Sequence, residues 1–274
     1  VMEARMQPVT GKRRRVLVTG ASGGIGRAIC HTLVRRALQD GSPIAIAAAG
    51  SRRSASLDAL VGELRAAGAQ AFPLGADLAD PDDCARLVAN ASDALGGLDG
   101  LVCNAGITAP AALADGSLDD WARTFDINTR AVWLLARAAR AHLAEAGGAI
   151  VAVSSMSGTF PHPGYGAYSA AKAALSMLCR QLAQEWAAHG VRVNTVSPGM
   201  IRTPLTESLY HDPEVERLRT ELVPLARIGR PEDIAEAVAW LLGPASSYVT
   251  GQDLRVDGGL CDRLLGTIPG RAAS

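Results

Sequence analysis

A single α/β domain, built on a doubly wound parallel sheet of about seven strands with helices on both faces, is the fold that this sequence predicts. Three observations lead to it. Short apolar runs rich in β-branched residues, such as residues 16–19, alternate with longer helical runs, such as residues 81–95. No internal repeat, linker or break in composition divides the chain. Its 274 residues, 48% of them hydrophobic, suffice for one large domain with a sizeable core.

The individual elements follow from apolar runs for buried strands and Ala/Leu-rich runs for helices. Strands are expected at residues 16–19, 43–48, 70–74, 98–103, 149–153, 191–196 and 253–256. Helices are expected at residues 27–38, 57–67, 81–95, 118–146 (as one or two helices), 167–184 and 231–242. We expect a disordered or extended lead at 1–14, the folded domain at 15–260 and a C-terminal tail at 261–274. Within the domain, residues 200–228 are polar and interrupted by prolines, which is typical of a substrate lid.

Composition and charge narrow the class of protein. The 27 basic and 27 acidic residues cancel, so nothing in the net charge indicates a nucleic acid or an anionic membrane as partner. No apolar run approaches the roughly 18 residues that a membrane helix needs. The five cysteines are scattered without a CxxC pair, which predicts reduced thiols, a cytoplasmic protein and no metal site. The basic run from Lys12 to Arg15 is interpreted as a solvated lead into the first strand.

A glycine-rich turn joins the first strand to the first helix, with the sequence Thr19-Gly20-Ala21-Ser22-Gly23-Gly24-Ile25-Gly26. Glycines at this place permit a tight turn and let a phosphate approach main-chain N–H groups. The positive end of the helix dipole then faces the phosphate. The turn therefore predicts a dinucleotide site, with the pyrophosphate over Gly20, Gly24 and Gly26.

The end of the second strand bears on which dinucleotide is bound. An acidic residue there holds the ribose 2′-hydroxyl of NAD in dinucleotide folds. Here the position is Ala48, and Ser51, Arg52 and Arg53 follow. A hydroxyl and guanidinium groups suit a 2′-phosphate, so NADP(H) is expected and NAD(H) is the alternative. The arginines are also interpretable as surface charges.

Two further strand ends carry candidate cofactor residues. Asp77 and Leu78 follow the third strand, and Asp77 could accept a hydrogen bond from the adenine amino group or serve only at a helix start. Asn104-Ala105-Gly106 follow the fourth strand. There Gly106 permits close approach of a ligand, and Asn104 can tie neighbouring strand ends together.

Tyr168 and Lys172 form the candidate reactive pair. They are four residues apart on an expected helix, so both side chains leave the same face. Lysine occurs only at positions 12 and 172, and arginine serves as the cation elsewhere. At about 5 Å and a dielectric of about 20, the attraction is roughly 3 kcal/mol, which would lower the Tyr168 pKa by about 2 units. A phenol shifted this far can exchange a proton near neutrality.

Two more polar positions accompany this pair. Ser154 and Ser155 stand at the carboxyl end of the fifth expected strand, where ligands sit in open parallel sheets. Asn128 lies in the middle of an expected helix, which is locally unfavourable and is either a surface accident or a site residue.

Together these motifs resemble the short-chain dehydrogenase/reductase family over roughly residues 15–260, a Rossmann-type oxidoreductase domain. The resemblance implies that Tyr168 is the general acid/base and Lys172 tunes its pKa and holds the nicotinamide ribose. It further implies that Ser155, chosen over Ser154 by spacing, binds the substrate carbonyl and that Asn128 holds a relay water. The implied cofactor residues are Gly20, Ser22, Gly24, Ile25, Gly26, Ser51, Arg52, Asp77, Leu78, Asn104, Ala105, Gly106, Tyr168, Lys172, Pro198, Gly199, Ile201 and Thr203.

Within the family, the sequence looks most like 3-oxoacyl-carrier-protein reductases and related ketoreductases. It departs from them at Cys103, where an asparagine is common, and it lacks the basic residues that would dock an acidic carrier at residues 142–146 and 184–185. A free small ketone or alcohol is therefore the expected substrate. The residues expected to line its pocket are Met156, Phe160, Tyr165 and Met200, while His162 is interpreted as a loop residue.

The sequence thus predicts an NADP(H)-dependent enzyme that interconverts a ketone and a secondary alcohol, acting on a small molecule as a homotetramer or homodimer. The alternatives are an NAD-dependent alcohol or sugar dehydrogenase and a 3-oxoacyl-thioester reductase. A non-catalytic dinucleotide sensor is a remote alternative, because Ser155, Tyr168 and Lys172 are all present.

Overall fold

The computed structural model describes residues 13–268, and within them seven parallel strands form one sheet in the order β3-β2-β1-β4-β5-β6-β7. The strands are β1 Arg14–Thr19, β2 Ile44–Gly50, β3 Gln70–Gly75, β4 Gly100–Cys103, β5 Ala149–Val153, β6 Arg192–Pro198 and β7 Asp253–Val256. The helices are α1 Gly24–Gln39, α2 Ala55–Ala66, α3 Pro81–Leu95, α4 Leu118–Phe125, α5 Ala131–Ala146, α6 Tyr168–Trp186, α7 Pro213–Glu221 and α8 Pro231–Leu242. The predicted doubly wound α/β fold is confirmed.

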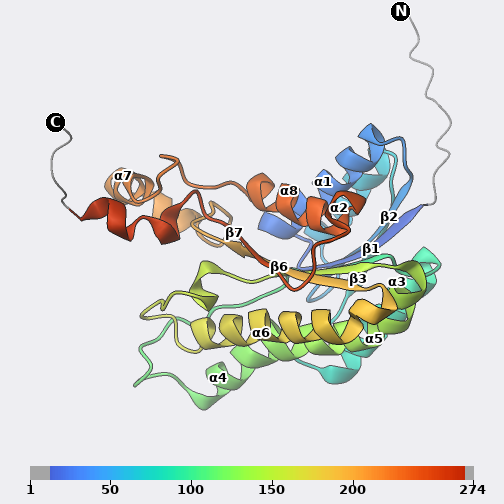
Figure 1. The fold of residues 1–274 in the computed structure, drawn as a ribbon, viewed down its shortest axis with the longest axis horizontal. Coiled ribbons are helices and arrows are strands. Elements are labelled where there is room, and N and C mark those ends of the chain that lie inside the picture. The colour runs from blue at the N-terminus through green and yellow to red at the C-terminus, as the bar shows by residue number, and fades with distance from the viewer. Residues whose placement is uncertain (1–12, 269–274) are drawn as a thin grey trace, which may run out of the picture.

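Helices cover both faces of the sheet, so its central strands are buried on both sides. One hydrophobic core lies between the sheet and α1, α2 and α8, and a second lies under α3, α5 and α6. Figure 1 shows α1 and α8 on one side of the sheet and α5 and α6 on the other. The interior residues of β1, β2, β4 and β5 are almost all apolar and fully buried, as expected for parallel strands covered twice.

The strand order reverses between β1 and β4, and this reversal positions the site. The chain leaves β1 toward β2 on one side, and it leaves β4 toward β5 on the other. The two connections therefore part above the carboxyl ends of β1 and β4 and leave a crevice, which is where ligands bind in such sheets. Gly20 and Asn104 are the first residues past these two strand ends.

The expected helix at residues 118–146 is interrupted. A π-helical turn, η1 Asp126–Arg130, separates α4 from α5 and contains Asn128. The Asn128 amide donates to the Thr124 carbonyl at 2.9 Å and to the Ile107 carbonyl at 3.0 Å. π-helical turns of this kind inside α-helices occur frequently at functional sites. The sequence pattern left one helix or two open, and the π turn was not predicted.

The basic lead was interpreted wrongly for two of its residues. Arg14 and Arg15 belong to β1, and neither is a freely solvated charge. Arg15 pairs with Asp99 at 2.8 Å, and Arg14 donates to the Leu242 carbonyl. These contacts, with the residue before β4 and with the last residue of α8, hold both side chains against the protein. Lys12 lies outside the described residues.

The segment expected as a lid contains ordered structure. A 3₁₀ turn at Glu207–Tyr210 and α7 lie within it, and Figure 1 shows α7 beyond the end of the two helical layers. Tyr210 is buried between two guanidinium groups, with Arg202 4.7 Å and Arg219 5.4 Å from its ring. Within residues 13–268, no helix combines the length and apolarity required to cross a membrane.

We expect Arg192→Met to lower the free energy of unfolding by about 2–4 kcal/mol. The Arg192 guanidinium donates to the carbonyls of Leu241, Leu242 and Gly243 at the end of α8, at 2.8–3.3 Å. Removing it leaves part-buried acceptors unpaired and takes a cation from the negative end of the helix. Urea denaturation measures the change. Arg180→Met, on the exposed face of α6, is the control and should stay within about 0.5 kcal/mol; equal losses in the two variants would contradict this account.

Candidate active site

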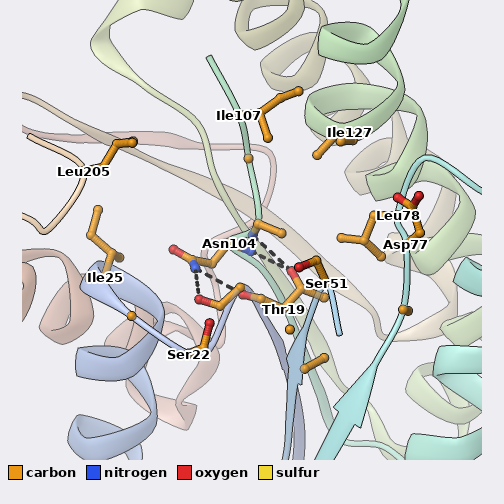
Figure 2. Close-up of a pocket in the computed structure, with 18 of the residues that line it drawn as sticks. Thr19, Ser22, Ile25, Ser51, Asp77, Leu78, Asn104, Ile107, Ile127 and Leu205 are labelled. Carbon is orange, nitrogen blue, oxygen red and sulfur yellow. Dashed lines mark hydrogen bonds between the residues drawn. The ribbon is translucent and has the colours of Figure 1, made fainter. Parts of the chain in front are cut away.

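A cavity of about 590 Å³ occupies the crevice above β1 and β4. Figure 2 shows it bounded by Ser22 and Ile25 from the glycine-rich turn, by Asp77 and Leu78 after β3, and by Ile107 and Ile127 on the side away from Ser22. Its volume lies in the range of small-molecule and cofactor pockets. The full lining is Thr19, Gly20, Ser22–Ile25, Ala49–Ser51, Ala76–Leu78, Leu87, Asn104–Ile107, Arg123, Ile127 and Thr203–Leu205.

Hydrogen bonds between β1 and the residues after β4 form the floor of this cavity. The Asn104 side-chain amide donates to the carbonyls of Thr19 and Gly20, each at 3.1 Å (Figure 2). The Thr19 hydroxyl accepts from the main-chain N–H groups of Asn104 and Ala105 at 3.1 and 3.2 Å. The predicted role of Asn104 in tying two strand ends together is therefore confirmed.

The glycine-rich turn fits a bound pyrophosphate. Gly20 has a φ of +62°, which favours glycine, and a Cβ there would lie 2.9 Å from the Ala105 Cα. A Cβ on Gly26 would lie 2.0 Å from the Gly20 carbonyl oxygen. Only glycine permits this crossing of turn and helix. The α1 N-terminus follows directly, and its first turn carries no acidic residue to compete with an anion.

The cavity brings together most of the predicted cofactor residues. Those that line it are Gly20, Ser22, Gly24, Ile25, Ser51, Asp77, Leu78, Asn104, Ala105, Gly106 and Thr203. Gly26 does not line it and serves the packing just described. Arg52 is exposed and lies outside the lining, and Arg53 pairs with Asp58 at 3.0 Å. The expected contact of Arg52 with a 2′-phosphate stays a prediction.

Residues at the end of β6 also lie outside this lining. Pro198 ends the strand, and a Cβ on Gly199 would meet Asp257 at 2.7 Å, so this glycine is needed for close packing. Ile201 and Met200 line a separate cavity of about 180 Å³ beside Val223 and Leu225. Of the predicted residues in this stretch, only Thr203 reaches the large cavity.

Tyr168, Lys172 and Ser155 lie close together, and none of the three lines the cavity itself. The Lys172 Nζ lies 5.7 Å from the centre of the Tyr168 ring, so the predicted shared helix face is confirmed. The Ser155 side chain lies close enough to Tyr168 to act on its pKa. The Lys172 Nζ also lies 3.4 Å from where a Cβ on Gly106 would stand. Because Gly106 lines the cavity, this cluster adjoins it.

The expected fall of the Tyr168 pKa is wrong for this geometry. Burial raises the pKa of Tyr168 above its ordinary value, and the Ser155 side chain only partly opposes this. Burial also lowers the pKa of Lys172 to about 8. The prediction counted the attraction between the two groups and left out the loss of water around each of them. The ammonium is held by the Val153 carbonyl at 2.9 Å rather than by the phenol.

The two serines after β5 differ in what their hydroxyls contact. Ser154 is buried and its hydroxyl is engaged with Ser176 at 3.0 Å and the Lys172 carbonyl at 3.3 Å. Ser155 is partly exposed, accepts from the Ser157 N–H at 3.1 Å and faces Tyr168. The geometry therefore leaves Ser155 as the serine that can contact a ligand at Tyr168.

Asn128 presents an unpaired acceptor to the same place. Its Oδ1 atom is buried and has no hydrogen-bond partner among the described residues. That atom lies 2.7 Å from where a Cβ on Gly106 would stand, next to the Lys172 ammonium. A buried polar atom without a partner is a site for a bound water.

The residues expected to line the substrate pocket are spread over several surroundings. Tyr165 stacks on His162 with 3.8 Å between ring centres and lies 6.4 Å from the Tyr168 ring. His162 lies in the irregular segment between β5 and α6, so its interpretation as a loop residue is confirmed. Phe160 is exposed beneath Arg255, and Met156 begins the turn that follows Ser155.

Several lining residues were missed by sequence reasoning. Ile107 directly follows a predicted motif, and Ile127 precedes Asn128, so proximity to known motifs could have indicated both. Arg123 and Leu205 carried no signal, because their helix and loop reach the cavity only through the tertiary fold. Among residues 13–268, no group of three metal-ligating side chains forms a metal site.

Comparison with known proteins places this geometry in a family. The sequence profile described as enoyl-(acyl carrier protein) reductase matches residues 20–261. The chain is 39% identical to glucose 1-dehydrogenase of Gluconobacter oxydans, over 90% of this chain and 91% of that protein. It is 36% identical to 3-oxoacyl-[acyl-carrier-protein] reductase of Synechocystis, over 89% and 95% of the two chains.

Solved structures of dehydrogenases and reductases have a similar fold. A short-chain type dehydrogenase/reductase from Mycobacterium marinum superposes with a TM-score of 0.79 at 37% identity, covering 95% of this chain and 97% of that one. A candidate NAD(P)-dependent gluconate 5-dehydrogenase from Beutenbergia cavernae, which contains NADP at low occupancy, gives a TM-score of 0.83 at 35% identity over 93% and 100%. The fold and site define a nicotinamide-dinucleotide oxidoreductase. The chain belongs to the short-chain dehydrogenase/reductase family.

We expect the stability difference between wild type and Lys172→Met to depend on pH. Between about pH 8 and about 10.5 the unfolded chain keeps a proton on Lys172 that the folded protein has lost. Because the unfolded state binds more protons there, wild-type stability rises with pH relative to the variant, by about 3 kcal/mol across the window. Paired urea denaturation curves at successive pH values measure this. A difference that stays constant with pH would show that Lys172 is not a buried ammonium.

Proposed function

We propose that this protein is an NADP(H)-dependent oxidoreductase that interconverts a ketone and a secondary alcohol, with Tyr168 as the general acid/base. The observation that carries the proposal is the cluster of Tyr168, Ser155 and Lys172, in which the Lys172 ammonium abuts Gly106 at the edge of the cavity. The cofactor supplies the hydride when bound. The protein supplies the proton and the polar surroundings of the carbonyl oxygen.

The proposed roles follow from the contacts of each side chain. In reduction, the Tyr168 hydroxyl gives its proton to the carbonyl oxygen while the Ser155 hydroxyl donates a hydrogen bond to the same oxygen. The Lys172 ammonium stabilises the phenolate that remains. The free Asn128 Oδ1 holds a water beside Lys172, through which a proton returns to the site. In oxidation, the phenolate accepts the alcohol proton.

The raised Tyr168 pKa is consistent with these roles in the reductive direction. A phenol that keeps its proton at neutral pH is ready to donate it. A Lys172 pKa of about 8 leaves most of the ammonium protonated at pH 7, so it can steady the phenolate as this forms. Near neutrality the Tyr168 hydroxyl therefore carries the proton that reduction consumes.

Preference for NADP(H) rests on the end of β2. Ala48, Ala49 and Gly50 offer no carboxylate for a ribose 2′-hydroxyl, and the Ser51 hydroxyl lines the cavity there. Arg52 is exposed next to it and free to swing toward a 2′-phosphate. NADP in the structure of the Beutenbergia relative supports the same choice.

The relatives support two substrate classes as alternatives to a free small ketone. Glucose 1-dehydrogenase supports a sugar, and the 3-oxoacyl reductases support a thioester. We also propose that the enzyme works in the cytoplasm as a homotetramer or homodimer. The five cysteines, all free thiols and four of them buried, support a reducing compartment.

We expect Tyr168→Phe to lower kcat for ketone reduction by about 10²–10⁴-fold, because the variant loses its proton donor. Affinity for the cofactor, measured by calorimetric titration, should change by less than about threefold. Tyr165→Phe is the matched control. It removes the hydroxyl of a tyrosine whose ring centre lies 6.4 Å from that of Tyr168, and it leaves the proposed acid in place. Comparable kcat values for Tyr168→Phe and wild type would end the proposal.

We expect kcat/KM with NADPH to exceed that with NADH by at least about tenfold, or about 1.4 kcal/mol. The Arg52→Gln variant should lose several-fold of this preference, because the guanidinium no longer pairs with a 2′-phosphate. Steady-state rates over a panel of ketones, sugars, sugar acids and a 3-oxoacyl thioester measure both effects and select the substrate class. A preference for NADH would overturn the NADP assignment and leave the sugar dehydrogenase alternative.

A further inference from the structure

Arg123 is the one basic residue among the described residues that line the large cavity. It lies on α4 and its side chain is exposed. Its guanidinium forms no hydrogen bond or ion pair with another described side chain. Asp120, one turn earlier, is engaged instead with the Ser117 hydroxyl at 2.7 Å. The Arg123 guanidinium is therefore available to a negatively charged group bound in this cavity.

The rest of the lining shows on which side of the cavity hydrogen-bond donors are scarce. On one side, the glycine-rich turn offers main-chain N–H groups and the Ser22 hydroxyl. Across the cavity, Figure 2 shows the apolar side chains of Ile107 and Ile127. Neither side chain can donate a hydrogen bond. Arg123 stands one helical turn before Ile127 and therefore approaches from this donor-poor wall.

We propose that Arg123 binds the pyrophosphate of the dinucleotide from the side opposite the glycine-rich turn. This inference rests on the proposed function. A bound pyrophosphate would have oxygen atoms that the donors of the glycine-rich turn do not face. A guanidinium suits the remaining oxygens because it can donate two parallel hydrogen bonds to a phosphate.

The topology separates this role from recognition of a 2′-phosphate. Arg123 belongs to the segment that follows β4, whereas Ser51 and Arg52 follow β2. β1 lies between β2 and β4, so the two segments leave the sheet two strand spacings apart, or about 10 Å. The pyrophosphate belongs over the crevice between β1 and β4, and the 2′-phosphate belongs at the end of β2. Arg123 therefore serves NAD(H) and NADP(H) alike, and Arg52 serves only NADP(H).

Calorimetric titration with ADP, 2′-AMP and NADP⁺ tests this assignment without use of catalysis. ADP carries the pyrophosphate and lacks the 2′-phosphate, and 2′-AMP carries only the 2′-phosphate. We expect Arg123→Gln to weaken ADP and NADP⁺ about tenfold or more and to change 2′-AMP by less than about twofold. Arg52→Gln should show the reverse pattern for ADP and 2′-AMP. Arg123→Lys should bind ADP more tightly than Arg123→Gln and less tightly than wild type, because it keeps the positive charge but lacks the planar guanidinium.

The matched control is Arg137→Gln, on α5, where the guanidinium packs over Trp133 at 5.1 Å outside the cavity lining. It should bind all three ligands as wild type does. Equal ADP affinity in Arg123→Gln and wild type would overturn the inference, and so would a loss confined to 2′-AMP. Failure of the wild type itself to bind ADP and NADP⁺ would overturn the proposed function, and the two failures are therefore distinguishable. Thermal melting of each variant confirms that it is folded.

Discussion

The hydrogen bonds that join the end of β1 to the residues after β4 set the geometry on which the site depends. The chain departs to opposite sides at these two strand ends, so main-chain groups there lose their sheet partners. The Asn104 amide satisfies the carbonyls of Thr19 and Gly20, and the Thr19 hydroxyl satisfies two N–H groups in return. Gly26 packs against the Gly20 carbonyl. These bonds and this close packing hold the two strand ends together as the floor of the cavity.

A second constraint is the burial of the only lysine within the domain. The Lys172 ammonium has lost nearly all contact with water, and the Val153 carbonyl replaces it only in part, so burial lowers its pKa to about 8. Placing a cation there destabilises the folded protein at neutral pH. A site that keeps such a group against its own stability is typical of one used for chemistry. The free oxygen of Asn128 beside it belongs to the same pattern.

Much of the fold could be predicted because a parallel sheet covered on both faces leaves a plain mark in the sequence. The bounds of α3, α8, β5 and β7 agree with the expected ranges, since prolines and glycines mark where those elements begin or end. The π turn around Asn128 was missed because a single extra residue per turn hardly changes the apolar pattern. The places of Arg14 and Arg15 were missed because their partners, Leu242 and Asp99, are far away in the chain.

The sequence by itself determined the succession of strands and helices and the kind of residue at each strand end, because burial and turn formation act on neighbouring residues. It also determined that Tyr168 and Lys172 share a helix face. Only the tertiary structure decided that Arg123 rather than Arg52 lines the cavity, and that the Tyr168 pKa rises rather than falls. Both depend on how closely distant segments approach and how much water they exclude, and no local pattern records either quantity.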